Sequence, residues 1–176
     1  MCIRDRVLLA GTGLFLRSLE RVRDVKPGFN PEGVLTGITV LPPAKYKDDK
    51  NRAAFAASVI SKLRNSPQVE MAAAAFPIPF SGANWHSSFR IEGRTQSPDE
   101  PEPHGGNRFV SPDYFKLMGI PLVKGRYFTE ADREGGMRVA IVDTKLASVF
   151  FKDEDPIGHR ISRGGGDPFT LSLIHI

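Results

Sequence analysis

Short apolar runs that stop at proline recur along this chain, and this pattern limits the folds that it can adopt. Residues 34–41 are β-branched and apolar and end at Pro42 and Pro43, which predicts a strand. A helix is predicted over 49–65, with Asp48 or Asp49 as its N-cap. A second apolar run, 69–76, is short and flanked by prolines, which favours a strand although its alanines favour a helix. The order strand, helix, strand predicts a split βαβ unit with the helix on one face of a sheet.

The next part of the chain is rich in proline, glycine, serine and charge, which predicts an exposed segment. Within it we expect one strand, 87–91, and a polar loop, 95–106. Residues 108–110 are predicted to be extended, and Ser111 is the predicted N-cap of a short helix that Gly119 ends. The strand and helix order of the first unit is thus repeated, although the residues of the two units differ.

The last third of the chain adds further predicted elements. Residues 121–123 are expected to be extended, 138–142 to form a buried strand and 144–151 to form a helix. In that helix the side chains of Leu146, Val149 and Phe150 are predicted to face inward. Taken together, these elements predict an α+β fold.

The beginning of the chain carries an apolar run, 7–16, that ends at Arg17. At about 1.5 Å per residue this run covers roughly half of a bilayer core that is ~30 Å thick, so it cannot span a membrane alone. Its glycines, Gly11 and Gly13, are common in membrane helices and unfavourable in soluble ones, which favours the end of a truncated transmembrane helix. The alternative is an amphipathic helix of a soluble domain with these residues near one face: Leu8, Phe15, Leu19 and Val22.

The two ends of the chain have an unusual character. Residues 1–6 (MCIRDR) and 171–176 (LSLIHI) resemble translated sequencing-adapter read-through, so we expect a non-native leader and a non-native tail. On this interpretation neither Cys2 nor His175 belongs to the natural protein.

Composition excludes several classes of function. The net charge of +4 is spread along the chain without a basic block or an alternation of aromatic and basic residues, so we expect no nucleic-acid partner. The single cysteine, Cys2, excludes an internal disulfide framework and a cysteine-based zinc site.

No arrangement of residues indicates catalysis, a cofactor or a metal site. The four histidines (His86, His104, His159 and His175) do not have the spacing of a zinc site. The His-Gly-Gly of 104–106 resembles an oxyanion-hole motif, but the chain contains no Gly-x-Ser-x-Gly nucleophile, so a flexible loop is the better interpretation. The glycines at 11–13 and 164–166 lack the Lys-Ser/Thr that a phosphate-binding loop needs.

Two acidic clusters and one group of aromatic residues have both a functional and a structural interpretation. The acidic clusters lack the spacing of a calcium loop, so solvated surface charge explains them better. The aromatic group is either an exposed contact patch or packing under a loop. The acidic residues are Asp99, Glu100 and Glu102, then Asp153, Glu154 and Asp155, and the aromatic residues are Phe80, Trp85 and Phe89.

Six short motifs occur in a fixed order along the chain, and each combines turn-forming residues with a neighbouring apolar run. They are PGFNP at 27–31, SPDYF at 111–115, MGIPL at 118–122, GRYFT at 125–129, VAIV at 139–142 and EDPIG at 154–158. Together they resemble the periplasmic core domain of MacB-type ABC transporter permeases, and most closely the duplicated orphan-permease, FtsX-like branch. The resemblance extends over about 7–161. Family members typically have Asn-Glu at 143–144 and often a tryptophan near Phe151, where this chain differs.

The resemblance implies a domain organisation. Residues 7–26 would be the C-terminal part of a transmembrane helix and its extension, and 27–170 a periplasmic core domain that is incomplete at its C-terminus. The domain would combine porter-like split βαβ units with a smaller inserted subdomain. It would lie outside the inner membrane, although Arg17, Arg21, Arg23 and Lys26 would favour the cytoplasm by the positive-inside rule.

The resemblance also implies a function. The chain would be a non-catalytic part of a permease that couples ATP hydrolysis by a partner ATPase to export or extraction of a hydrophobic, peptide or lipid-linked substrate. Its expected partners are a cytoplasmic ABC ATPase, a periplasmic adaptor, membrane lipid and a second permease half in a dimer or pseudo-dimer. A sensor or interaction module without transport is the alternative, and the missing nucleophile disfavours a hydrolase.

Overall fold

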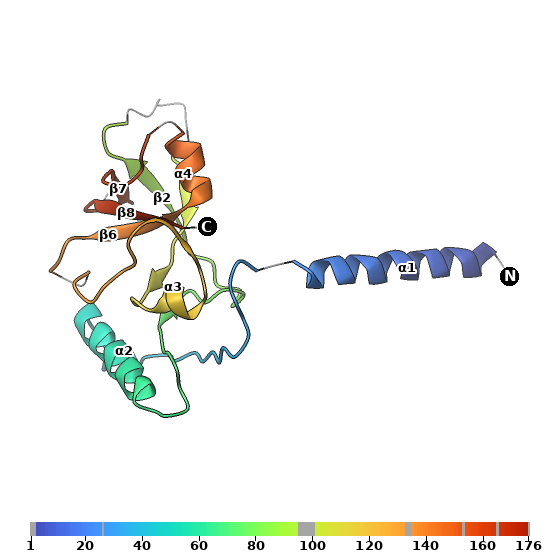
Figure 1. Cartoon of the computed structure of the whole chain (residues 1–176), viewed down its shortest axis with the longest axis horizontal. Coiled ribbons are helices and arrows are strands. Elements are labelled where there is room, and N and C mark those ends of the chain that lie inside the picture. Colours follow the sequence, from blue (N-terminus) through green and yellow to red (C-terminus); the bar gives the residue numbers. More distant parts are fainter. Residues whose placement is uncertain are drawn as a thin grey trace. The chain divides into compact units, whose positions relative to one another are not determined.

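The computed structural model describes residues 3–25, 27–94, 101–132, 135–152, 154–164 and 166–175. The chain divides into two compact units, Met1–Asn30 and Pro31–Ile176, and each is described by itself. The first unit contains helix α1 and the residues that follow it up to Asn30, and the second contains the described strands and the remaining helices (Figure 1).

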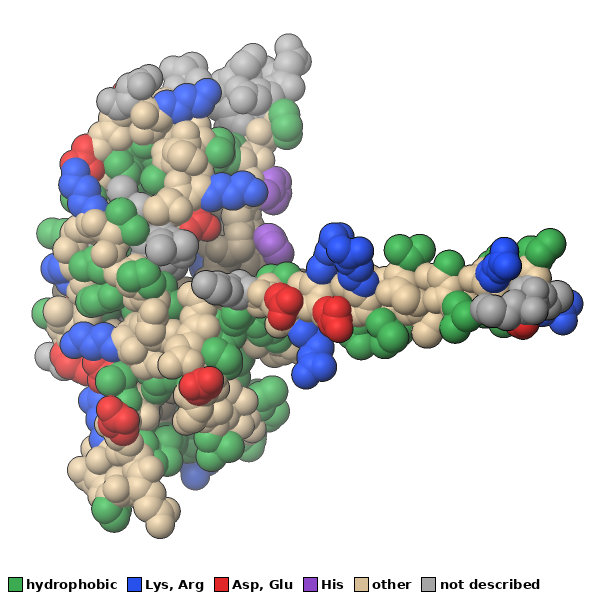
Figure 2. Space-filling model, turned by 45° about the vertical axis from the view of Figure 1, so that its right-hand side comes forward, with side chains coloured by type: hydrophobic (Ala, Val, Ile, Leu, Met, Phe, Trp, Pro, Cys, Tyr) green, Lys and Arg blue, Asp and Glu red, His purple; other side chains and the backbone are tan. Residues whose placement is uncertain are grey.

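Helix α1 (Ile3–Arg23) is exposed along its whole length. Figure 2 shows its hydrophobic side chains spread along the helix between groups of arginine side chains. Large exposed apolar residues include Leu14, at 71% exposure, and Phe15, at 69%. Within the described residues, no helix has an apolar run long enough to cross a membrane.

A small antiparallel sheet and two helices form one part of the second unit. Strand β1 (Ala75–Phe76) pairs with β4 (Phe109–Val110), so that Phe76 lies opposite Phe109. Helix α2 (Asp49–Arg64) precedes β1, and the short helix α3 (Tyr114–Leu117) follows β4.

The ends of α2 and α3 show how well local sequence signals predict helices. The N-cap of α2 is Asp48, whose Oδ1 accepts a 2.7 Å hydrogen bond from the N–H of Asn51, as predicted. The prediction that Ser111 caps α3 is wrong, because α3 begins after Asp113 and the Ser111 hydroxyl accepts a 2.9 Å hydrogen bond from Ala74 N–H instead. Gly119 lies two residues after the end of α3 and has a φ of +64°, so the helix stops before it, as predicted.

A six-stranded sheet forms the other part of the second unit. Its order is β3-β2-β7-β8-β5, and β6 pairs with β8 in parallel. Helix α4 (Thr144–Phe150) follows β6 directly, and Asp143 caps it by accepting a 2.6 Å hydrogen bond from Leu146 N–H. The strands are β2 (His86–Ile91), β3 (His104–Gly106), β5 (Leu122–Gly125), β6 (Val139–Asp143), β7 (Arg160–Arg163) and β8 (Phe169–His175).

The main hydrophobic core lies between α4 and the six-stranded sheet. Leu171 of β8 is only 1% exposed, and Phe151, just after α4, is 3% exposed. Phe150 packs edge-to-face on Phe89, with ring centroids 5.2 Å apart. The buried members are Phe89, Ile91, Val142, Phe151 and Leu171.

Two expectations for this part of the chain need correction. Val149 does not face inward, because its side chain is 51% exposed, whereas Ala147 is buried in its place. The end of the predicted loop 95–106 forms strand β3, because it pairs with β2. Residues 95–100 of that loop, with Asp99 and Glu100, lie outside the described residues.

The predicted strand at 34–41 is also wrong, because these residues belong to no sheet. They form an extended segment, which we call the extended edge, and Leu35 in it is 98% exposed. The predicted strand at 69–76 is present only as Ala75–Phe76. A strand needs a partner as well as propensity, and the propensity of 34–41 did not reveal whether a partner was present.

The mixed helix and sheet architecture that the sequence predicted is confirmed. The predicted strands at 87–91 and 138–142 correspond to β2 and β6, and the predicted helices at 49–65 and 144–151 correspond to α2 and α4.

Candidate interaction surface

Three half-exposed aromatic side chains meet where the small sheet approaches the large one. Trp85 directly precedes β2, and its ring lies edge-on to Phe76 at 5.7 Å and to Phe109 at 5.8 Å between centroids. The guanidinium of Arg163, from the end of β7, lies 5.2 Å from the centre of the Phe109 ring. We call Phe76, Trp85 and Phe109 the aromatic cluster.

The sequence left open whether Phe80, Trp85 and Phe89 form an exposed contact patch or pack under a loop, and the structure gives different answers for these residues. Phe89 is only 7% exposed and belongs to the core, so it is not part of a contact patch. Trp85 and Phe80 are 45% and 85% exposed. Sequence reasoning did not find Phe76 and Phe109, because they become neighbours of Trp85 only through the pairing of β1 with β4.

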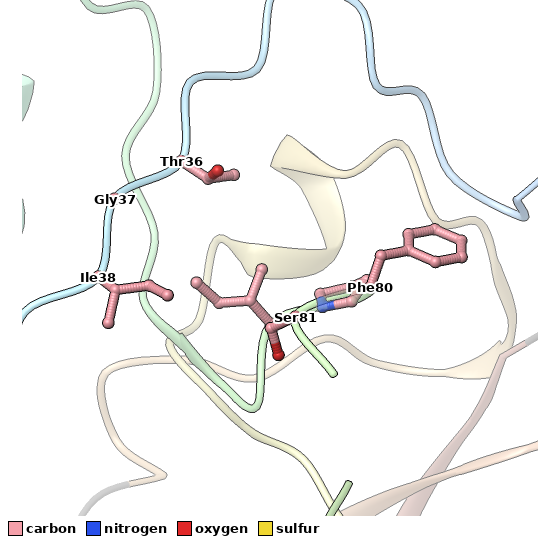
Figure 3. Close-up of a pocket in the computed structure, with 7 residues that line it drawn as sticks. Thr36, Gly37, Ile38, Phe80 and Ser81 are labelled. Carbon is pink, nitrogen blue, oxygen red and sulfur yellow. The ribbon is translucent and has the colours of Figure 1, made fainter. Parts of the chain in front are cut away.

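A shallow pocket of about 410 Å³ opens between the extended edge and the segment that follows β1. In Figure 3, Thr36 and Ile38 lie on one side, and Phe80 and Ser81 lie on the other. None of its lining residues is charged, and Phe80 and Ile38 are largely exposed. The pocket is lined by Thr36, Gly37, Ile38, Ile78, Pro79, Phe80 and Ser81.

His104 and His159 each make a local contact of their own. The His104 ring nitrogen Nδ1 lies 2.7 Å from the carbonyl oxygen of Glu102, and His159 packs on the Phe151 ring at 5.1 Å. Among the described residues, no three histidine, cysteine, aspartate or glutamate side chains form a group that could hold a metal ion. The side chain of His175 and the position of Asp153 lie outside what the structure describes.

Two of the described acidic residues of these clusters, Glu102 and Asp155, are paired with cations. Glu102 pairs with Arg90, and this contact holds the pKa of the Glu102 carboxyl below its ordinary value. Asp155 accepts a 2.6 Å hydrogen bond from the ammonium of Lys124, which likewise lowers the pKa of Asp155. Both pairs are surface contacts, in agreement with the solvated-charge interpretation.

Two further ionisable groups lie near α3. Burial raises the pKa of the Tyr114 phenol, and the nearby Arg108 opposes this rise. The Asp132 carboxylate is fixed by Arg126, which holds the pKa of Asp132 well below its ordinary value. Neither Tyr114 nor Asp132 lines the shallow pocket or belongs to the aromatic cluster.

Comparison with known proteins identifies relatives that function as transporter parts. Residues 21–172 match the family model of the MacB-like periplasmic core domain. The pyoverdine export ATP-binding/permease protein PvdT of Pseudomonas fluorescens is 41% identical over 58 residues, which are 32% of this chain and 8% of that protein.

Two solved structures share the fold. The periplasmic region of MacB from Actinobacillus actinomycetemcomitans has a TM-score of 0.51 and 16% identity, over 68% of this chain and 49% of that one. The extracellular domain of the noncanonic ABC-type transporter YknZ from Gram-positive bacteria has a TM-score of 0.52 and 20% identity, over 73% of this chain and 63% of that one. The chain therefore spans less than two thirds of the length of these relatives.

Proposed function

This chain belongs to the family of MacB-like periplasmic core domains, and we propose that it couples ATP hydrolysis by a partner ATPase to export or extraction of a hydrophobic, peptide or lipid-linked substrate. The observation that carries this proposal is the family match over 21–172, most of the chain. The named export protein PvdT supports the direction of transport.

The surface of the domain supports a role in binding and motion instead of chemistry. The shallow pocket has an uncharged lining, and the aromatic cluster is apolar and half-exposed. Apolar, weakly charged surfaces favour hydrophobic ligands and protein contacts. We therefore propose that the chain has no catalytic activity of its own and that the ATPase activity resides in a partner subunit.

We place the chain at the inner membrane, with the residues after about 26 on the extracytoplasmic side. Helix α1 supports this proposal, since its apolar side chains are exposed along its length and most of the helix precedes the matched residues 21–172. The proposed partners are a cytoplasmic ABC ATPase, a periplasmic adaptor, membrane lipid around α1 and a second permease half in a dimer or pseudo-dimer. No nucleic-acid partner is proposed.

The test is to inactivate the partner ATPase by substituting its catalytic residues in cells that carry the intact locus. Efflux of a panel of apolar dyes and peptides is then measured. We expect efflux to stop while the amount of permease in the membrane stays the same. Unchanged efflux by an inactive ATPase would contradict the proposed coupling.

The shallow pocket supports a second function, ligand sensing without transport, because its uncharged lining suits a small apolar ligand. This alternative predicts saturable binding of such a ligand by the isolated chain, together with efflux that does not depend on the ATPase. A titration without saturation would count against sensing.

A further inference from the structure

The aromatic cluster keeps about half of each ring exposed although its rings pack on one another. Phe76 is 52% exposed, Trp85 45% and Phe109 47%. The three residues come from β1, from the position before β2 and from β4, so three separate segments hold them. Rings that already fix one another lose little side-chain entropy when a ligand lies on them. The cluster therefore suits a ligand with an apolar body.

A cation borders this apolar area. The guanidinium of Arg163 lies 5.2 Å from the centre of the Phe109 ring. Within the described residues Arg163 forms no ion pair with a carboxylate, whereas Arg160 on the same strand pairs with Glu92 at 3.2 Å. Arg163 is half-buried, so water solvates its charge less well than that of a fully exposed arginine. A half-buried guanidinium without a carboxylate partner favours an anion.

The sequence around the cluster contains no acidic residue that could neutralise this cation. No residue within two positions of the cluster or of Arg163 is an aspartate or a glutamate, and two direct neighbours, His86 and Arg108, are basic. Among the described groups, none accepts a hydrogen bond from the indole N–H of Trp85, so this N–H is a further donor at the surface. Donors and a cation beside apolar rings are complementary to a ligand that carries negative charge.

We propose that the aromatic cluster and Arg163 bind an organic anion with an apolar body, whose apolar part lies on the rings and whose anionic group pairs with Arg163. This inference rests on the proposed function, because it specifies the charge of the transported substrate. Binding needs neither ATP nor a partner subunit, so the two can fail separately. Absent binding would overturn the inference alone, whereas efflux that does not depend on the ATPase would overturn the proposed function alone.

The test uses the whole chain, with decanoate as the probe. Decyltrimethylammonium is the matched control, because its apolar chain has the same length and its head group has the opposite charge. Trp85 is the single tryptophan of the chain, so its fluorescence reports on the cluster and not on the apolar side chains of α1. Each compound is titrated below its micellar concentration. We expect a saturable change with decanoate and an affinity at least about ten-fold weaker for decyltrimethylammonium.

Variants of two arginines on β7 separate the charge from the apolar contact. Arg163→Gln should weaken decanoate binding by about ten-fold without weakening the binding of decyltrimethylammonium, and Arg163→Lys, which keeps the charge, should retain most of the affinity. The matched control is Arg160→Gln, because Arg160 already pairs with Glu92, and it should change the affinity by less than about two-fold.

Circular dichroism would verify that the variants are folded. The comparison of the two compounds on the parent chain decides the matter even if Arg163→Gln does not fold. The proposal would be overturned by the absence of a saturable change with decanoate, by equal affinities of the parent chain for the two compounds, or by an unchanged decanoate affinity in folded Arg163→Gln.

Discussion

The guanidinium of Arg126 holds the carboxylate of Asp132 in a two-pronged ion pair, with Nη1–Oδ2 at 2.6 Å and Nη2–Oδ1 at 2.7 Å. The N–H and hydroxyl of Thr129 also donate to Asp132, at 2.8 and 3.1 Å. The Asp132 side chain is only 7% exposed. Next to this pair, Tyr127 stacks on Phe115 and its hydroxyl donates to the carbonyl of Ile120. These contacts hold the loop 126–132 against the residues around α3.

Asp132→Asn should therefore destabilise the domain in a manner that depends on pH. The contacts with Arg126 hold the folded-state pKa of Asp132 below its ordinary value of 3.8. The stabilisation is consequently complete at neutral pH, begins to decline as the pH falls below that value, and is fully lost only below the lower folded-state pKa. We expect the substitution to lower the free energy of unfolding by about 1–3 kcal/mol at neutral pH and by less at about pH 3.

Urea unfolding of the parent chain and the variant at the two pH values measures this effect. The control is Asp167→Asn, which breaks a pair with Arg138 in which both side chains are more than half exposed. That change should cost less than about 1 kcal/mol. An equal cost of Asp132→Asn at both pH values would contradict the assigned role.

Leu171→Ala should be the most damaging of these substitutions, because Leu171 is 1% exposed in the main core. We expect a loss of about 2–5 kcal/mol in the free energy of unfolding. Met137→Ala, at a position that is 70% exposed, serves as the control and should change stability by less than about 0.5 kcal/mol. Similar melting temperatures for the two variants would show that β8 does not complete the core.

Helix signals were the most predictable part of this fold. Asp48 and Asp143 each precede a helix, and each carboxylate accepts a hydrogen bond from a backbone N–H three residues later. Such caps involve neighbours in sequence, so a local pattern can predict them; Asp48 was one of the two predicted caps of its helix, whereas no cap was predicted for the helix after Asp143. Ser111 is also a typical N-cap residue, but its hydroxyl accepts a hydrogen bond from the N–H of Ala74, which is distant in sequence. No local sequence pattern predicts that contact.

Asp48→Ala should weaken α2 and cost about 1 kcal/mol of stability, because the N–H of Asn51 loses its acceptor. Asp49→Ala is the matched control, since its carboxylate pairs with Arg52 at the exposed surface. The control should cost less than about 0.5 kcal/mol. Thermal unfolding followed by circular dichroism distinguishes the two, and an equal loss would argue against the cap.

The candidate interaction surface was harder to predict than the helices. Trp85 and Phe80 could be singled out as aromatic residues in a polar region, but Phe76 and Phe109 join Trp85 through strand pairing across more than thirty positions. The shallow pocket likewise joins 36–38 with 78–81. No local sequence pattern predicts a contact between residues that are distant in sequence. The sequence analysis therefore did not predict which segments meet at the aromatic cluster or at the shallow pocket.

Trp85→Ala should loosen the small sheet from the large one, since Trp85 contacts both Phe76 and Phe109. We expect the free energy of unfolding to fall by about 1–3 kcal/mol, because the ring is half-exposed and makes two edge-to-face contacts. Trp85→Phe keeps an aromatic ring and should lose less than about 1 kcal/mol. If the two variants have the same unfolding free energy, the aromatic contacts do not stabilise this junction.

The central claim is that the matched domain works outside the inner membrane as part of a permease, and labelling of a single cysteine tests it most directly. Met137→Cys, in a Cys2→Ser background, places a thiol at an exposed position of the second unit in the intact gene product. Intact cells are treated with a maleimide that crosses the outer membrane but not the inner one. We predict full labelling without lysis, whereas labelling that requires lysis would contradict the account.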